Sequence, residues 1–314
     1  MNQIKFIIGL IILTSFLSCK NEFQENTSNA QFVKLETNEN KFEDFWYQGK
    51  AELSSYKLEQ ARYGEIHTGE AVMIFVTEDF SASKLVKLDN PSATPKDAVN
   101  ILKLNMTRKF NTGIYPYSMM TSVFSPVDIK KQPNTLKLTA TSQEWCGHTF
   151  MQVNLDKENY SVNLNSYFES EGDQNFKVDK VMLEDEIWNR IRIAPKSLPT
   201  GDIMLLPSTI YARLRHTDFK PEQATADLKS NKLNQKLMDY TIQYKNMDRT
   251  LKVTFQKEFP FQIEAWEESN ISGWGSNAKT LTTKAVRKKS MMLDYWNKHN
   301  NEDLELRKEL NLEN

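Results

Sequence analysis

Alternation of apolar and polar residues is the feature that most constrains the fold of this chain. It recurs over five stretches, residues 102–107, 136–140, 160–168, 251–255 and 261–265. A period of two places one face of each strand in the core and the other in water, which is typical of antiparallel sheet. Residues 71–76 form a continuous apolar run, so we expect a central strand buried on both faces.

We therefore predict a mainly β fold: a large curved antiparallel sheet, shaped as an open barrel or sandwich-like, with a few short helices packed against it. The strand pattern starts at Phe45. A helix is expected over residues 183–191, ended by Pro195. Further helices are predicted over 98–102, in conflict with a strand at Leu102, and over 290–299.

The N-terminus carries a short apolar leader that ends in Cys19. It has one Lys, an apolar run over residues 6–13 that is too short to span a bilayer, and the small Ser18 before the cysteine. The segment resembles a bacterial lipoprotein signal peptide, whose last cysteine is acylated and becomes the mature N-terminus. The resemblance implies a lipid anchor on Cys19. Lys20, in place of Asp, implies the outer membrane, facing the periplasm or the cell surface.

The chain then divides into four parts. Residues 1–18 are the predicted signal peptide, and 19–41 are the lipidated Cys19 with a polar, flexible tether. Residues 42–300 are expected to form a single β-rich domain, followed by a charged, frayed tail over 301–314.

Composition excludes several classes of function. The net charge is −1, from 40 basic and 41 acidic side chains, so no overall field favours nucleic acid. The chain has 2 cysteines, and a lipidated Cys19 would leave only Cys146 as a thiol. An intramolecular disulfide and a cysteine-rich zinc site are then both excluded. Histidines without metal-ligand spacing and the lack of a glycine-rich phosphate loop predict no metal and no cofactor.

The most unusual local sequence is a cluster of four residues, Glu144, Trp145, Cys146 and His148. On one strand, Glu144, Cys146 and His148 would share a face and suggest a thiol, a base and a carboxylate. However, strand residues two apart lie about 6.6 Å from each other, beyond hydrogen-bond reach. If Cys146-Gly147 forms a hairpin turn instead, the three side chains diverge. We therefore expect a structural turn with a buried, packed Cys146.

Two other segments carry charged side chains that could be functional. Glu264, Glu267 and Glu268 lie beside Trp266 and could serve a glycosidase, but charge on the wet face of a strand explains them more simply. Residues 279–289 carry five basic side chains and no acidic one. They could contact anionic lipid, although a solvated face is the simpler explanation.

Three stretches carry a resemblance to a known family: residues 45–53 (FWYQGKAEL), 144–148 (EWCGH) and 272–275 (SGWG). Behind the leader, they resemble an uncharacterised family of Bacteroidota-type envelope lipoproteins that often carries the label septum formation inhibitor Maf. True Maf proteins are α/β nucleotide pyrophosphatases with a Ser-Pro-Arg-Arg motif. Nothing in this sequence matches that motif, so no residue role can be carried over.

The sequence thus favours a membrane-anchored envelope lipoprotein with a non-enzymatic binding or structural role. Its partners would be the membrane, through the lipid anchor, and a lipid, a glycan or an envelope protein, but no nucleic acid. The alternative is an envelope hydrolase or transferase that uses Cys146 and His148, or a His and Glu site assembled by folding. A deep pocket that contains His148 with a carboxylate within reach would favour the enzyme, whereas a dry aromatic trough would favour the binding role.

Overall fold

The computed structural model describes residues 39–312, and these build one 15-stranded sheet with four short α-helices. The helices are α1 (Glu39–Trp46), α2 (Ile187–Ile193), α3 (Thr209–Arg215) and α4 (Glu305–Glu309). The strands are β1 (Ala51–Arg62), β2 (Glu65–Ser81), β3 (Ala98–Thr112), β4 (Tyr115–Pro126), β5 (Lys137–Glu144), β6 (Gly147–Leu155), β7 (Asn159–Asn165), β8 (Gln174–Asp179), β9 (Met182–Leu183), β10 (Gly201–Leu206), β11 (Glu222–Ser230), β12 (Leu237–Tyr244), β13 (Arg249–Gln256), β14 (Ile263–Ser272) and β15 (Lys279–Leu293).

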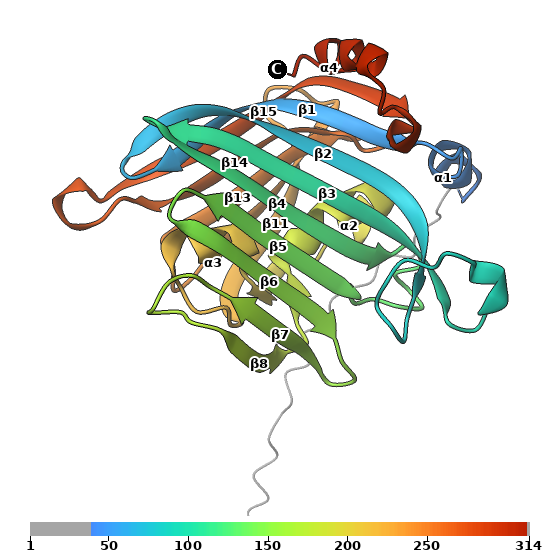
Figure 1. Cartoon of the computed structure of the whole chain (residues 1–314), viewed down its shortest axis with the longest axis horizontal. Helices are drawn as coiled ribbons and strands as arrows, with labels where there is room; N and C mark the ends of the chain where they lie inside the picture. Colours follow the sequence, from blue (N-terminus) through green and yellow to red (C-terminus); the bar gives the residue numbers. More distant parts are fainter. Residues whose placement is uncertain (1–38, 313–314) are drawn as a thin grey trace, which may run out of the picture. The chain divides into compact units, whose positions relative to one another are not determined.

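Two antiparallel meanders make up the sheet. Strands β1 to β8 follow one another in space as in sequence, and so do β10 to β15. The meanders meet where β1 pairs with β15, and the short β9 adds the one parallel pairing at the edge next to β10. The predicted fold class is confirmed: a mainly β protein whose sheet curves strongly but stays open (Figure 1).

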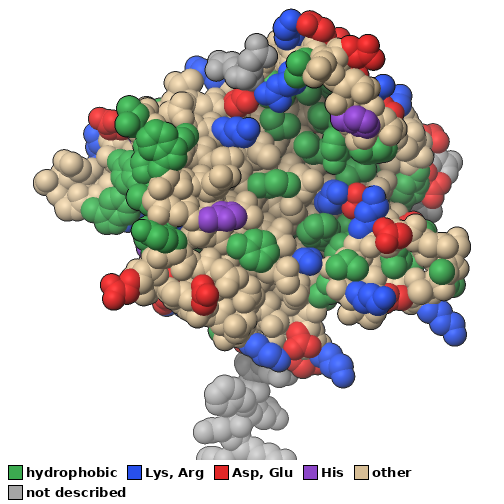
Figure 2. All heavy atoms as spheres, in the orientation of Figure 1, with side chains coloured by type: hydrophobic (Ala, Val, Ile, Leu, Met, Phe, Trp, Pro, Cys, Tyr) green, Lys and Arg blue, Asp and Glu red, His purple; other side chains and the backbone are tan. Residues whose placement is uncertain are grey.

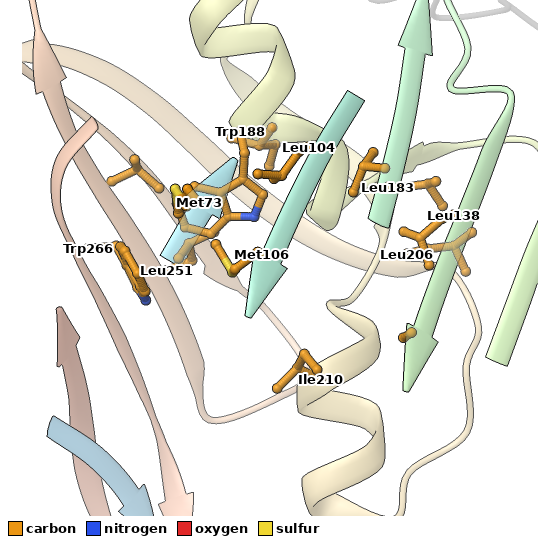
Figure 3. Close-up of a cluster of buried hydrophobic side chains, with 14 of the residues drawn as sticks. Met73, Leu104, Met106, Leu138, Leu183, Trp188, Leu206, Ile210, Leu251 and Trp266 are labelled. Atoms are coloured by element: carbon orange, nitrogen blue, oxygen red, sulfur yellow. The ribbon is translucent and has the colours of Figure 1, made fainter. Parts of the chain in front are cut away.

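The concave side of the sheet is filled by the protein's own side chains. Helix α2 packs against β3 and β4, and α3 packs against β4 and β5. The rings of Trp188 in α2 and Trp266 in β14 pack in a T-shaped arrangement, with Met73 and Met106 beside them (Figure 3). Long antiparallel strands with one apolar face need such a cover, and the two helices provide it.

The predicted alternating strands are present, and the run 71–76 lies in the central strand β2. Its predicted burial on both faces is wrong, because Val72 and Ile74 on the second face are only partly buried. The helix predicted over 183–191 is also confirmed, as a 3₁₀ turn over Glu184–Glu186 followed by α2. The helix predicted over 98–102 is wrong, because those residues begin β3 and pair with the end of β2. The helix predicted over 290–299 is wrong as well, because β15 continues to Leu293 beside β1 and leaves one 3₁₀ turn, Tyr295–Asn297.

Three further expectations need correction. Phe45 and Trp46 do not start a strand; they end α1, whose Phe42, Phe45 and Trp46 pack against the core. Residues 39–41, placed in the predicted tether, begin that helix. The tail is not frayed over 301–312: a 3₁₀ turn (Asn301–Leu304) and α4 lay it on the convex side of β1 and β2.

The predicted leader, Cys19 and the tether up to residue 38 lie outside the described residues. Within residues 39–312, the helices are all too short or too polar to cross a membrane.

Candidate functional site

A cavity of about 160 Å³ lies between α3 and the concave side of the first meander. Both apolar and polar side chains line it. The apolar lining includes Met119, Ala140, Met151, Leu164 and Phe176, and the polar lining includes Ser142, Thr149, Glu171, Arg213 and His216. We call this space the α3 cavity.

Helix α3 is fixed at both ends. At its start, the buried carboxylate of Asp185 accepts hydrogen bonds from the backbone N–H and the hydroxyl of Thr209, both at 2.8 Å. Burial raises the pKa of Asp185 to about 6, against these hydrogen bonds, and nearby Glu184 adds to the rise. At its end, His216 adopts a left-handed backbone (φ 53°), which stops the helix and places the imidazole at the cavity.

Arg213 organises the polar side of the α3 cavity. Its Nε donates to the Thr149 hydroxyl at 3.0 Å, and its Nη2 donates to the Glu144 carboxylate. Tyr115 donates to the other Glu144 oxygen at 2.9 Å. The guanidinium also lies over the ring of Phe168, with Cζ 4.4 Å from the centroid. Its charge is therefore balanced by Glu144 before any ligand arrives.

A histidine and a carboxylate meet at the same cavity. His216 Nδ1 lies 2.5 Å from Glu171 Oε1, and His216 Nε2 lies 3.3 Å from Arg213 Nη1. Glu171 comes from the connection between β7 and β8, so this contact joins that connection to the end of α3. The imidazole is thus oriented by the carboxylate, while its other nitrogen faces a cation.

Ser142 supplies a free hydrogen-bonding group. Its side chain is 1 % exposed, and its hydroxyl has no partner among the described residues. A buried hydroxyl without a partner is unfavourable by about 1–3 kcal/mol. A ligand or an ordered water in the α3 cavity would remove that penalty.

The structure separates the four residues of the predicted cluster. Trp145 and Cys146 form a two-residue turn between β5 and β6, one residue earlier than the predicted Cys146-Gly147 turn. Glu144 is buried toward Arg213, whereas His148 is exposed on the opposite face of the sheet, paired with Gln143. The predicted divergence is therefore confirmed, and only Glu144 reaches the α3 cavity, through Arg213.

Cys146 is exposed, not buried as predicted. The reason is its place at the tip of a tight hairpin, where the sheet ends and no element covers the turn. Trp145 is 65 % exposed for the same reason. The backbone N–H of Cys146 donates to the Tyr115 hydroxyl at 2.8 Å, so the turn is held by its backbone rather than by the thiol.

We predicted that Glu264, Glu267 and Glu268 lie on the solvent-exposed face of a strand. For Glu268 this prediction is wrong. Glu268 is buried and accepts from Arg108 Nη2 at 2.6 Å. Burial alone would raise the pKa of Glu268, but the nearby Arg108 and Arg249 guanidinium groups hold it below its usual range. In contrast, Glu264 and Glu267 pair with basic side chains at partly exposed positions.

Sequence reasoning missed Arg213, His216 and Glu171. A short helical spacing of Ile210 and Leu214 after Pro207 is the signal that could have located α3. No local signal connects Glu171 to α3, because the contact depends on where folding places the β7–β8 connection relative to the end of that helix.

Among residues 39–312, no three His, Cys, Asp or Glu side chains gather as a possible metal site. Comparison with protein-family models, with curated proteins and with solved structures finds no match for this chain.

Proposed function

We propose that this protein is a membrane-anchored lipoprotein of the bacterial outer membrane with a non-enzymatic binding role. The leader that ends in Cys19 supports the anchor, and the α3 cavity supports the binding role. The cavity carries the proposal because it joins an apolar wall to an unpartnered buried hydroxyl on Ser142. Ligand sites are commonly concave, mostly apolar and equipped with a few placed polar groups.

Size and charge define the ligand class. A volume of about 160 Å³ is close to that of an engineered apolar cavity, about 150 Å³, that binds benzene. Because Glu144 already balances Arg213, the cavity favours a neutral polar group over an anion. The ligand is therefore a small apolar molecule, or the end of a larger one, with one hydroxyl or carbonyl group for Ser142. The remaining concave face is filled by the core and receives no whole lipid (Figure 3).

The test uses full-length protein in lipid nanodiscs, with p-cresol and toluene as probes. These probes differ by one hydroxyl. We expect p-cresol to bind saturably to the wild type. Ser142→Ala should weaken its affinity about tenfold, toward the affinity for toluene. Ala140→Leu fills the cavity and abolishes binding of both probes, whereas Ala278→Leu, at an exposed turn, leaves both unchanged. Binding that survives Ala140→Leu would refute the α3 cavity as the site.

Anchoring has its own experiment. Wild-type protein made in a bacterial host should incorporate labelled palmitate and sediment with membranes. Cys19→Ala should lose the label and appear in the soluble fraction. Label that persists in Cys19→Ala would refute the anchor without touching the binding proposal.

One observation favours a second candidate, a hydrolase. His216 is oriented by Glu171 at 2.5 Å, and Ser142 lines the same cavity with a free hydroxyl. Such a base and nucleophile would suit acyl transfer, but Arg213 Nη1 faces the nitrogen that must accept the proton. A fluorophosphonate probe that labels Ser142 in the wild type but not in His216→Ala would replace the binding role with this one.

A further inference from the structure

One end of the sheet carries a rim of exposed aromatic and aliphatic side chains. Among the described residues, seven of the 15 exposed large hydrophobic side chains lie in or next to the turns of this end: Tyr63, Ile66, Ile114, Trp145, Tyr167, Ile271 and Trp274. Figure 1 places the turns β1–β2, β3–β4, β5–β6 and β14–β15 together at the left, and Figure 2 shows hydrophobic side chains gathered there. We call this end the turn rim.

A buried arginine without a carboxylate lies at the turn rim. The Arg62 side chain donates to the backbone carbonyl of Leu214 and lies over three rings, with Cζ 4.3 Å from the Tyr63 centroid and 5.2 Å from that of Trp274. Arg62 is 5 % exposed and makes no salt bridge with any described residue, and its Nε has no hydrogen-bond partner. A buried cation normally has an anionic partner.

A second arginine adds to the positive charge. Arg215 Cζ lies 5.6 Å from the Trp274 centroid, and its guanidinium donates to the Gly273 carbonyl at 3.2 Å. Like Arg62, Arg215 has no carboxylate partner within residues 39–312. The buried carboxylates of Glu184 and Glu268 pair with other arginines: Glu184 with Arg249, and Glu268 with both Arg108 and Arg249.

These residues line a second, much smaller cavity of about 20 Å³. Two residues of its lining carry buried atoms without a hydrogen-bond or ion-pair partner among the described residues: Nε of Arg62 and the side-chain oxygen of Gln60. Arg249 and Glu268 also line the cavity, but they pair with each other, with Nη1 3.9 Å from Oε2. One free donor beside one free acceptor matches an oxyanion that has a hydroxyl next to it. The volume admits an oxyanion group but not the molecule that carries it, which would rest outside on half-exposed Trp274.

We propose that the turn rim binds an acidic sugar, with the carboxylate or sulfate held by Arg62 and Arg215 and the sugar ring stacked on Trp274. A sugar supplies the oxyanion, the neighbouring hydroxyl and a flat apolar face together. An anionic membrane fits less well, because exposed Glu65 lies at the β1–β2 turn of the rim and repels a charged surface. Helix α1, where the described chain begins, also lies at the other end of the strands (Figure 1).

The experiment titrates full-length protein in nanodiscs with methyl β-D-glucuronide and, as the neutral match, methyl β-D-glucoside. We expect saturable binding of the glucuronide with a Kd of about 1 mM or lower, and at least tenfold weaker binding of the glucoside. Arg62→Gln and Trp274→Ala should each weaken glucuronide binding at least tenfold. Trp296→Ala and Lys177→Gln, at exposed positions away from the rim, should leave it unchanged.

Because Arg62 is buried, a thermal melt checks that Arg62→Gln folds, and Arg215→Gln decides if it does not. Trp274→Ala should leave p-cresol binding at the α3 cavity intact, so this proposal and the proposed function fail separately. Four results would overturn the proposal. The glucoside could bind as tightly as the glucuronide, or inorganic sulfate could bind as tightly as the glucuronide without depending on Trp274. Anionic vesicles could bind through Arg62, or no saturable binding could be found, which would leave an ordered water in the cavity.

Discussion

At the scale of single residues, buried arginines are held in different ways. Arg192 is clamped by Glu52, with Nη2 2.6 Å from Oε2, and its Nε donates to the Pro260 carbonyl at 3.0 Å. Its guanidinium also lies over Trp46 and Phe75. Burial alone would raise the pKa of Glu52, but the charge and hydrogen bonds of Arg192 hold that pKa below its usual range.

Breaking this pair should therefore be costly. Glu52→Gln leaves the Arg192 charge buried without a counter-ion, so we expect a loss of about 3–5 kcal/mol in the free energy of unfolding by urea. The exposed pair of Asp156 and Lys177 is the control, and Asp156→Asn should change stability by less than about 1 kcal/mol. The double variant Glu52→Leu/Arg192→Met should recover most of the loss; equal effects of Glu52→Gln and Asp156→Asn would contradict the clamp.

Asp185 makes stability depend on pH in the opposite sense to Glu52. Its folded pKa, about 6, is above the unfolded value of about 3.9, so the folded state holds this proton more tightly. The resulting stability is fully present below pH 4 and is lost as the pH rises through about 6. Asp185→Asn should remove this dependence. Between pH 4.5 and 7.5, the variant should lose roughly 2–3 kcal/mol less free energy of unfolding than the wild type. Parallel stability curves for the two proteins would contradict the assignment.

At the scale of elements, the C-terminal segment shows how a polar sequence can still be a structural part. Asn300 and Asp303 form a capping box that starts its first turn, and α4 follows. Leu310 then packs with Ala51, Leu53 and Val76 on the convex side of the sheet. The Ser55 hydroxyl donates to the Leu310 carbonyl, which fixes the end of the segment.

Leu310→Ala tests this packing. Leu310 is 4 % exposed, so we expect a loss of about 2 kcal/mol or more in the free energy of unfolding. Leu304→Ala, at a position 56 % exposed in the same segment, is the matched control and should be nearly neutral. If Leu310→Ala were as neutral as Leu304→Ala, the segment would not be part of the folded sheet in solution.

The elements also show how far the sequence could be interpreted. Alternation located the long strands, because a sheet with one wet face imposes that period. It could not locate α3, which buries four residues, or α4, which buries none and is held through Leu310 at its end, because both depend on a surface built elsewhere. The helix predicted at 98–102 failed because pairing with β2 outweighs a local helix-start signal. Of the polar residues at the α3 cavity, Glu144 had a sequence signal, but its partner Arg213 follows 69 residues later.

At the scale of the whole molecule, aromatic side chains tie the two meanders and α2 together. Trp266 of β14 lies 4.8 Å from Tyr56 of β1 and 5.5 Å from Trp188 of α2, measured between ring centroids. These three residues belong to the second meander, the first meander and the helix that crosses between them. The two halves should therefore unfold together.

Trp266→Ala should lower the free energy of unfolding by about 3–5 kcal/mol and keep a single transition. Far-UV circular dichroism and tryptophan fluorescence should give coincident unfolding curves for the wild type. Trp296→Ala, at a 45 % exposed position, should leave the midpoint nearly unchanged. Separate transitions by the two probes would show that the meanders unfold independently.

The junction of β1 with β15 has a consequence for how the chain is made. Ser54 and Ser290 share a hydrogen bond at this junction although they are 236 residues apart in sequence. During synthesis, β1 therefore has an unpaired edge until β15 emerges, and a chain cut before β15 keeps that edge open. Such high contact order slows folding and favours association between incomplete chains. Premature termination should yield aggregates rather than a smaller folded protein.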